Sequence, residues 1–314
     1  AKASKLSFDN CPVFKMKGPL FYSKILLFGE YGIIKDSKGL SIPYNFYKGA
    51  LKSDANASKE AMKSNESLEA FAAYLKKLTK KEPNLVSFDL DLLKADIAAG
   101  MYFDSSIPQG YGVGSSGALV AAIYDKYAHD KITVLENLTR EKLLKLKVVF
   151  GKMESFFHGK SSGLDPLNSY LSLPILINSK DNIESTSIPS QNAEGKGAVF
   201  LLDSGIVGET APMVQIFMEQ MKNDGFRKML KNQFIKHTDA CVEDFVNGNI
   251  QSLFGNLKQL SHVVLDNFNG IDTNDYYLKL CGSGGGGYIL GFTEDFEKAK
   301  TSLKDYKLEV VYNF

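Results

Sequence analysis

The sequence predicts a fold that contains both helices and strands and is divided between two domains. At 314 residues and 44% hydrophobic content, the chain can bury one large core or two medium cores, and two domains are more usual at this length. Apolar residues recur with the period of a strand in some segments and of a helix in others. A polar stretch rich in Ser, Asn and Asp, residues 178–196, separates two apolar regions. We therefore expect an N-terminal domain at residues 1–190 and a C-terminal domain at residues 191–314.

The N-terminal region shows four strand-like and three helix-like segments. Aromatic and branched side chains predict strands at residues 19–28, 41–51, 86–90 and 173–177. Apolar residues spaced by three or four predict helices at residues 67–79, 118–127 and 139–157. We expect the last two helices to pack together and form the N-terminal core.

The C-terminal region begins and ends with a strand. The expected order is a strand at 198–203, three helical stretches between 211 and 264, strands at 276–281 and 287–292, a helix, and a strand at 308–312. This order predicts a four-stranded sheet with helices on one side. The connection at residues 265–274 is short for a return from helix to strand, which leaves open whether a segment is missing there.

Charge, cysteine content and hydropathy exclude several classes of protein. The 37 basic and 36 acidic side chains give a net charge of +1, so nucleic acid is not an expected partner. Cys11, Cys241 and Cys281 are odd in number and far apart, which favours a reducing compartment, buried thiols and no metal cluster. No run reaches the roughly 18 apolar residues of a membrane span, and no signal peptide is recognisable. We expect a cytoplasmic protein without a membrane partner.

A glycine-rich loop before an expected helix is the most informative motif. It reads Pro108-Gln-Gly-Tyr-Gly-Val-Gly-Ser-Ser-Gly-Ala118. Glycines let the backbone approach an anion, and the helix N-terminus adds free N–H groups and partial positive charge. The G-x-G-x-x-G pattern from Gly112 to Gly117 is shared by dinucleotide-binding folds and protein kinases, and a plain turn is a third interpretation. Ser115 and Ser116 could cap the helix or bind the Mg²⁺ of a nucleotide.

A second glycine-rich loop lies between two expected strands. It has five glycines in the six positions Gly282 to Gly287. A hairpin rarely needs so many, so contact between this backbone and a ligand or another loop is the better interpretation.

Two acidic residues and one lysine are the candidates for chemistry. Glu154 lies late on an expected helix and Asp165 follows a Gly/Ser turn, so one carboxylate could hold Mg²⁺ while the other accepts a hydroxyl proton. Lys24 lies in an apolar strand before Gly-Glu-Tyr-Gly, where it either reaches solvent or turns inward to a carboxylate. We interpret His158 as structural, because no other histidine lies at metal-ligand spacing.

A competing motif predicts a hydrolase. Gly159-Lys-Ser161-Ser-Gly163 matches the G-x-S-x-G nucleophile elbow, which requires a strand entering the turn. The preceding residues favour a helix, so a Ser161 hydrolase is only a remote alternative.

The order of these motifs resembles that of the family of galactokinase, homoserine kinase, mevalonate kinase and phosphomevalonate kinase (GHMP). That family has a strand ending in G-E-[HY], a P-x-x-x-G-[LV]-G-S-S loop and a late G-[AS]-G-G-G-G loop, and residues 19–292 contain all three. The His-Gly-x-x-Ser-Gly-x-Asp stretch from His158 to Asp165 is most similar to mevalonate kinases. The resemblance implies an α+β fold with a domain like ribosomal protein S5 domain 2 followed by a ferredoxin-like domain.

The resemblance also implies roles for individual residues. Asp165 would be the catalytic base with Lys24 beside it, and Ser116 and Glu154 would hold Mg²⁺. Residues that would bind ATP are Gly110, Gly112, Val113, Gly114, Ser115, Ser116, Gly117, Gly282, Ser283, Gly284 and Gly285. Glu30, Tyr31 and Thr210 would lie toward the substrate. The implied reaction is ATP-dependent phosphorylation of the primary hydroxyl of mevalonate.

Departures from the family pattern leave the alcohol open. Tyr31 replaces the usual histidine of mevalonate kinases and is commoner in phosphomevalonate kinases, and Gly208 stands where arginine often occurs. Lys160 and Ser161 replace the usual x-Pro. Phosphomevalonate kinase, another GHMP kinase and a non-catalytic sensor therefore remain alternatives, and a homodimer is left open. A dinucleotide-binding dehydrogenase is excluded, because its glycine motif normally opens the first strand–helix–strand unit.

Overall fold

The first half of the chain forms an antiparallel sheet. The computed structural model describes residues 19–54, 56, 58–134, 137–261, 271–272 and 275–314. The strands of this sheet are β1 (Phe21–Phe28), β2 (Gly39–Ser53), β3 (Met101–Ser105), β4 (Ile175–Ser179) and β5 (Asn182–Ser185). Their order is β1-β2-β4-β5, and β3 pairs with the end of β2. The long strand β2 therefore organises this half of the molecule.

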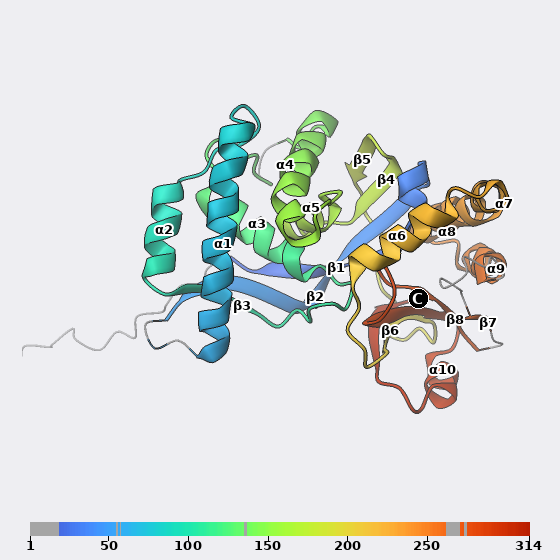
Figure 1. The fold of residues 1–314 in the computed structure, drawn as a ribbon. Helices are drawn as coiled ribbons and strands as arrows, with labels where there is room; N and C mark the ends of the chain where they lie inside the picture. Colours follow the sequence, from blue (N-terminus) through green and yellow to red (C-terminus); the bar gives the residue numbers. More distant parts are fainter. Residues whose placement is uncertain (1–18, 55, 57, 135–136, 262–270, 273–274) are drawn as a thin grey trace, which may run out of the picture.

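Helices cover one face of this sheet (Figure 1). They are α1 (Lys59–Lys81), α2 (Leu90–Ala98), α3 (Ser115–Tyr127), α4 (Arg140–His158) and α5 (Leu164–Leu171). Helix α3 is buried along most of its length and contacts α4, α5 and β1. The expected packing of the helices at 118–127 and 139–157 is confirmed, and the core of this half lies around α3.

The second half forms another antiparallel sheet, in the order β10-β6-β9-β8-β7. Its strands are β6 (Ala198–Asp203), β7 (Ile271–Asp272), β8 (Tyr277–Leu280), β9 (Tyr288–Thr293) and β10 (Leu308–Asn313). The four predicted strands are confirmed, and the short β7 makes five. Both sheets are antiparallel, and most of the helices are grouped apart from the strands, as an α+β fold requires.

Helices lie on both faces of the second sheet, so the prediction of helices on one side was wrong (Figure 1). The helical elements are α6 (Thr210–Gln220), α7 (Asp224–Met229), a π-helical turn (Leu230–Ile235), α8 (Lys236–Asn247), α9 (Ile250–Ser261) and α10 (Phe296–Ser302). Phe200 and Leu202 of β6 pack with α10, while the alternate residues Val199 and Leu201 join the larger core on the opposite face. Alternate residues of β6 point to opposite faces of the sheet, and both sets are buried.

Several short segments differ from the sequence prediction, and α2, β3 and β5 were not predicted. Residues 86–90 do not form a strand: Phe88 makes one isolated bridge with Ala128, and Leu90 already begins α2. The Asp89 carboxylate accepts a hydrogen bond from the backbone N–H of Leu92, so it caps that helix and stops the strand. Helix α5 was not predicted, although Pro166 in its first turn is compatible with a helix start.

The polar stretch at residues 178–196 contains regular secondary structure. It contains β5, which closes the first sheet by pairing with β4. The second sheet begins at Ala198, so the proposed division near residue 190 falls between the two sheets. The prediction about residues 265–274 lies mostly outside the described residues, as does the one about Cys11. Within the described part of the chain, none of the helices is both long and apolar enough to cross a membrane.

Candidate active site

The first glycine loop connects β3 to α3 and packs against β1. The backbone N–H of Lys24 donates to the carbonyl oxygen of Val113 over 3.0 Å, which fixes the loop to the strand. Gly114 precedes α3 with φ 84°, in the left-handed region, and no side-chain oxygen caps the helix. A Cβ on Gly114 would lie 3.0 Å from Cγ of Lys24. The loop therefore leaves the helix N-terminus open and lets the lysine pass beneath it.

Lys24 turns inward to Asp165. Its Nζ lies 2.8 Å from Oδ1 of Asp165, and the two side chains are 4% and 39% exposed. Burial lowers the pKa of Lys24, but the adjacent charge of Asp165 outweighs it and the net pKa is raised, so the lysine is charged. Asp165 lies in the first turn of α5, where the helix dipole favours a carboxylate. The inward interpretation of Lys24 fits this geometry.

Ser116 and Glu154 meet beside this pair. The Ser116 hydroxyl, in the first turn of α3, donates to Oε1 of Glu154 over 2.8 Å. Glu154 is buried near the end of α4. Burial and the charge of Asp165 raise the pKa of Glu154 to about 7, and hydrogen bonds from Ser161 and Ser116 oppose that rise.

His158 also belongs to this group, which the sequence interpretation missed. Its Nε2 lies 2.9 Å from the Ser116 hydroxyl. The signal was available, because His158 follows Glu154 by four residues and therefore shares its face of α4. The sequence interpretation of His158 as structural did not anticipate this contact with Ser116.

The two glycine loops touch through their backbones. A Cβ on Gly112 would lie 2.7 Å from the carbonyl oxygen of Cys281, and a Cβ on Gly282 would lie 3.1 Å from Cα of Gly112. Gly208 N–H donates to the Gly110 carbonyl oxygen over 2.8 Å, which brings the 204–209 connection onto both loops. The five glycines from Gly282 to Gly287 all have positive φ, so the glycine-rich composition reflects backbone conformation as well as close approach.

Tyr31 and Thr210, both predicted on the substrate side, are connected through Ser283, which was predicted to bind ATP. The Tyr31 hydroxyl donates to the carbonyl oxygen of Ser283 over 2.5 Å. The Ser283 hydroxyl donates to Oγ1 of Thr210 over 3.3 Å, at the start of α6. Tyr31 also packs on Phe217 with the ring centroids 4.8 Å apart. The turn after β1, the second glycine loop and α6 are therefore joined at one point.

Glu30 is turned into the protein and pairs with Lys279. The Lys279 Nζ lies 2.6 Å from Oε1 of Glu30, and the two side chains are only 9% and 5% exposed. Lys279 also donates to the carbonyl oxygen of Leu27 over 2.9 Å. The other carboxylate oxygen, Oε2 of Glu30, is buried without a hydrogen-bond partner. The partner of Glu30 was not predicted, since nothing in the sequence relates β8 to the turn after β1.

The oxygen donors at this place suit Mg²⁺ bound with a nucleotide. Among the described residues, no group of three or more His, Cys, Asp or Glu side chains could hold a metal by itself. Mg²⁺ typically uses one or two protein oxygens and completes its shell with water and phosphate oxygens. In an octahedral shell, adjacent oxygens lie about 2.9 Å apart, close to the 2.8 Å between the Ser116 and Glu154 oxygens. The pair therefore fits Mg²⁺ of this kind.

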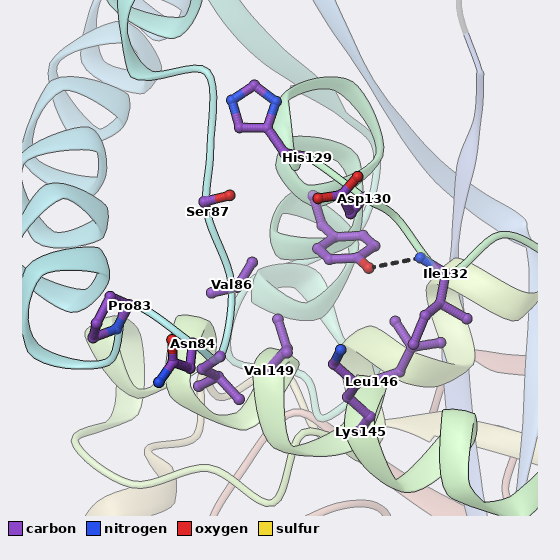
Figure 2. Close-up of a pocket in the computed structure, with 12 residues that line it drawn as sticks. Pro83, Asn84, Val86, Ser87, His129, Asp130, Ile132, Lys145, Leu146 and Val149 are labelled. Atoms are coloured by element: carbon purple, nitrogen blue, oxygen red, sulfur yellow. Dashed lines mark hydrogen bonds between the residues drawn. The ribbon is translucent and has the colours of Figure 1, made fainter.

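A cavity of about 170 Å³ lies elsewhere, between the α1–α2 connection, the end of α3 and the middle of α4 (Figure 2). Tyr124, whose hydroxyl accepts a hydrogen bond from Ile132 N–H over 3.1 Å, forms one wall. Four of its polar residues, Asn84, His129, Asp130 and Lys145, are exposed. None of the predicted site residues lines this cavity, so the candidate active site is the one at the glycine loops.

The sequence and the structure of this chain are both similar to those of GHMP kinases. Residues 69–172 match the family described as "GHMP kinases N terminal domain". No curated protein matches the sequence. Among solved structures, the L. major mevalonate kinase in complex with R-mevalonate is 16% identical with a TM-score of 0.55, over 94% of this chain and 95% of that one.

Two other solved structures are similar to the same extent. The Streptococcus pneumoniae phosphomevalonate kinase in complex with phosphomevalonate and AMPPNP is 13% identical with a TM-score of 0.57, over 93% of this chain and 99% of that one. The Lactococcus lactis galactokinase complexed with galactose is 12% identical with a TM-score of 0.57, over 96% and 95% of the two chains. The predicted two-domain α+β fold is confirmed. Residues 69–172 thus match the N-terminal domain of the GHMP kinases, and the chain has the fold of these solved kinases over nearly its whole length.

Proposed function

We propose that the protein transfers the γ-phosphoryl group of ATP to the primary hydroxyl of mevalonate and forms 5-phosphomevalonate. The observation that carries this proposal is the 2.8 Å pair of Lys24 and Asp165 beneath the first glycine loop. A carboxylate that remains partly exposed next to a buried ammonium is suited to accept a proton from an alcohol. The Ser116–Glu154 pair alongside supplies the oxygens for Mg²⁺.

The loop residues would position the nucleotide. The backbone N–H groups from Gly112 to Ser115 and the N-terminus of α3 would bind the phosphates, and the second glycine loop would close the site from the other half of the chain. Mg²⁺ held by Ser116 and Glu154 would neutralise charge on the phosphate oxygens. Phosphoryl transfer needs mainly such positioning and charge stabilisation from the protein.

Asp165 and Lys24 would act on the acceptor alcohol. Asp165 accepts the hydroxyl proton as the O–P bond forms and the bond to the leaving ADP breaks. Lys24, which stays charged, stabilises the negative charge that develops on the attacking oxygen. Because Lys24 is almost fully buried, its charge acts in a medium of low dielectric, where it counts for more than in water.

The residues predicted on the substrate side would determine which alcohol is phosphorylated. Tyr31 and Thr210, connected through Ser283, would line the site of the acceptor alcohol. Glu30 would not touch the alcohol but would support this site through its ion pair with Lys279. The similar fold of a mevalonate kinase crystallised with R-mevalonate supports mevalonate as the acceptor. The mevalonate-kinase-like motif from His158 to Asp165 supports it further.

The test is ADP release with Mg²⁺-ATP against mevalonate, phosphomevalonate, homoserine and galactose, with the purified full chain. We expect turnover with mevalonate well above that with the other three alcohols. Turnover with phosphomevalonate alone would replace the proposal by a phosphomevalonate kinase. An absence of turnover with all four would favour the non-catalytic sensor.

The hydrolase alternative lacks its required local structure. The turn that contains Ser161 follows the helix α4, whereas the nucleophile elbow follows a strand. The Ser161 hydroxyl donates to Glu154, and the nearby His158 contacts Ser116. A fluorophosphonate probe is therefore expected to leave Ser161 unmodified.

A further inference from the structure

Ser161 is the motif residue that the proposed mechanism does not use. It lies in the turn between α4 and α5, and its hydroxyl donates to Oε2 of Glu154 over 2.5 Å. The hydroxyl oxygen of Ser161 also accepts a hydrogen bond from Gly163 N–H over 3.0 Å. Since Gly163 N–H already occupies one lone-pair direction of the hydroxyl oxygen, the O–H bond is left to point at the carboxylate.

The turn is pressed tightly onto α4, so Ser161 has a fixed place. A Cβ on Gly151 would lie 3.0 Å from the carbonyl oxygen of Ser161. Gly163 has φ 77°, and a Cβ there would collide with the carbonyl oxygen of Lys147 at 2.0 Å. Two glycines on opposite sides of this contact therefore allow the backbones to meet, and the position of the hydroxyl is set by packing.

The two oxygens of Glu154 consequently have different partners. Oε1 accepts from Ser116 at 2.8 Å, and Oε2 accepts from Ser161. Glu154 is 3% exposed, so solvent does not compete for either oxygen. A carboxylate held by one oxygen cannot rotate about its last bond without breaking that hydrogen bond, which keeps the other oxygen directed at Ser116.

We propose that Ser161 is a positioning residue for the magnesium site: it holds Oε2 of Glu154 so that Oε1, together with the Ser116 hydroxyl, is available to Mg²⁺. Partners of metal ligands commonly set ligand orientation in this way. This inference rests on the proposed binding of Mg²⁺ and nucleotide at this site, and it is independent of the alcohol that is phosphorylated.

A purely structural role for Ser161 makes a different prediction. If the hydroxyl only stabilised the turn, its loss would loosen the first turn of α5 and weaken nucleotide binding whether or not metal is present. A role in orienting Glu154 instead affects only the binding that depends on metal. The two roles are separated by measuring nucleotide affinity with and without Mg²⁺.

The experiment is calorimetric titration of the full chain with AMPPNP in excess Mg²⁺ and in EDTA. We expect Ser161→Ala to bind AMPPNP about 10-fold more weakly than wild type in Mg²⁺ and equally well in EDTA. Ser161→Thr, which keeps the hydroxyl, should restore most of the affinity in Mg²⁺. If Ser161→Ala does not fold, Ser161→Cys takes its place, because a thiol is a weak donor of similar size.

The matched control is Ser155→Ala, one residue after Glu154 on the same helix. The Ser155 hydroxyl donates to the Gly151 carbonyl oxygen over 2.6 Å and does not contact Glu154. We expect its AMPPNP affinity to equal that of wild type in both conditions. Equal affinity of Ser161→Ala and wild type in Mg²⁺, or an equal loss in Mg²⁺ and EDTA, would overturn the proposal.

The wild-type titration distinguishes this failure from failure of the proposed function. Wild-type affinity that is the same in Mg²⁺ and EDTA would refute a magnesium site at Ser116 and Glu154, and the role of Ser161 with it. Magnesium-dependent affinity without phosphorylation of mevalonate would refute only the substrate. In that case the comparison of Ser161→Ala, Ser161→Thr and Ser155→Ala still tests whether Ser161 positions Glu154.

Discussion

Lys24 and Asp165 differ in exposure as their proposed roles require. The lysine is covered by the first glycine loop, while the carboxylate keeps 39% of its side-chain surface open to an approaching alcohol. A covered cation cannot exchange its partner for water, so its charge stays directed at Asp165. The proposed base is therefore accessible, and its counter-charge is fixed.

Removing either charge should abolish most turnover without abolishing nucleotide binding. Asp165→Asn and Lys24→Met are each expected to lower kcat by roughly 10² to 10⁴-fold, because each removes a group that acts at the reacting oxygen. AMPPNP affinity, measured by calorimetry, should change little. The control is Lys126→Met, which removes another lysine–aspartate pair. Lys126 lies in the last turn of α3, at the opposite end of that helix from the glycine loop, and pairs with Asp96 of α2. Near-normal kcat in Asp165→Asn would exclude it as the base.

Glu154 should make the metal-free protein less stable as the pH rises. Its pKa is raised from 4.5 to about 7 in the folded protein, so the folded state favours the protonated form. Between these two values, each unit of pH lowers the free energy of unfolding by up to about 1.4 kcal/mol, and above the folded value the loss is complete.

Glu154→Gln removes this penalty. In EDTA, its free energy of unfolding relative to wild type should rise by on the order of 2 kcal/mol from about pH 5 to about pH 8 and then stay constant. Urea unfolding at several pH values measures it. Glu66→Gln, on the exposed surface of α1, should show no such trend. A difference that does not vary with pH would contradict the raised pKa.

Single residues were predictable where their chemistry is local in sequence. Ser116 and Gly114 could be proposed for the site because a glycine loop before a helix has its own pattern. The partner of Glu30 was not, because Lys279 reaches it from the other half of the chain. His158 lay between these cases, since its helical spacing from Glu154 was visible but its contact with Ser116 depends on how α3 and α4 pack.

At the scale of elements, the site depends on how closely α3 and α5 approach. Gly117 in the first turn of α3 makes this possible, because a Cβ there would lie 2.8 Å from the backbone of Asp165 and Pro166. The same residue therefore allows the packing of two helices and sets the distance of the base from the phosphate loop.

Gly117→Ala should displace α5 and, with it, Asp165. We expect kcat to fall by at least ~10-fold, since small misplacements of reacting groups are costly, and the free energy of unfolding to fall by about 1–3 kcal/mol. The control is Gly255→Ala on α9, where an added Cβ meets nothing within 4 Å. That change should leave kcat unaltered and stabilise the protein by about 0.5–1 kcal/mol. Equal behaviour of the two variants would contradict the close approach.

The elements themselves were predictable in proportion to their length and periodicity. Helix α4 and strand β6 came within a few residues of their observed bounds, because their apolar patterns are strong. Helix α5 was hidden by the Gly/Ser turn before it and by its eight-residue length. The continuous apolar run of β6 is typical of a strand buried on both faces, and the prediction of helices on one side did not use it.

At the scale of the whole molecule, a buried ion pair joins the two halves of the chain. Glu30 follows β1 of the first sheet and Lys279 lies on β8 of the second, and both are buried. Tyr31 and Ser283 connect the same two segments through a hydrogen bond. The arrangement of the two domains proposed from the sequence is thus held by polar contacts beside the candidate active site.

Breaking this ion pair should destabilise the whole protein. Lys279→Met leaves the Glu30 carboxylate buried without its cation, and we expect a loss of about 3–5 kcal/mol in the free energy of unfolding. The double variant Glu30→Gln with Lys279→Met should regain part of that loss, which a double-mutant cycle in urea measures. Lys222→Met, which removes an exposed pair with Glu219, should have no measurable effect. A double variant less stable than Lys279→Met would contradict this account.

The contact between Gly112 and the carbonyl of Cys281 makes one thiol a reporter of movement. Cys281 is 1% exposed, and burial raises the pKa of its thiol to about 11, so it reacts slowly while the loops are in contact. In a variant with Cys11→Ser and Cys241→Ala, the rate of labelling by a thiol reagent would measure how often the two halves separate. We expect AMPPNP with Mg²⁺ to slow that rate, so that a residue without a part in the chemistry records each opening of the site.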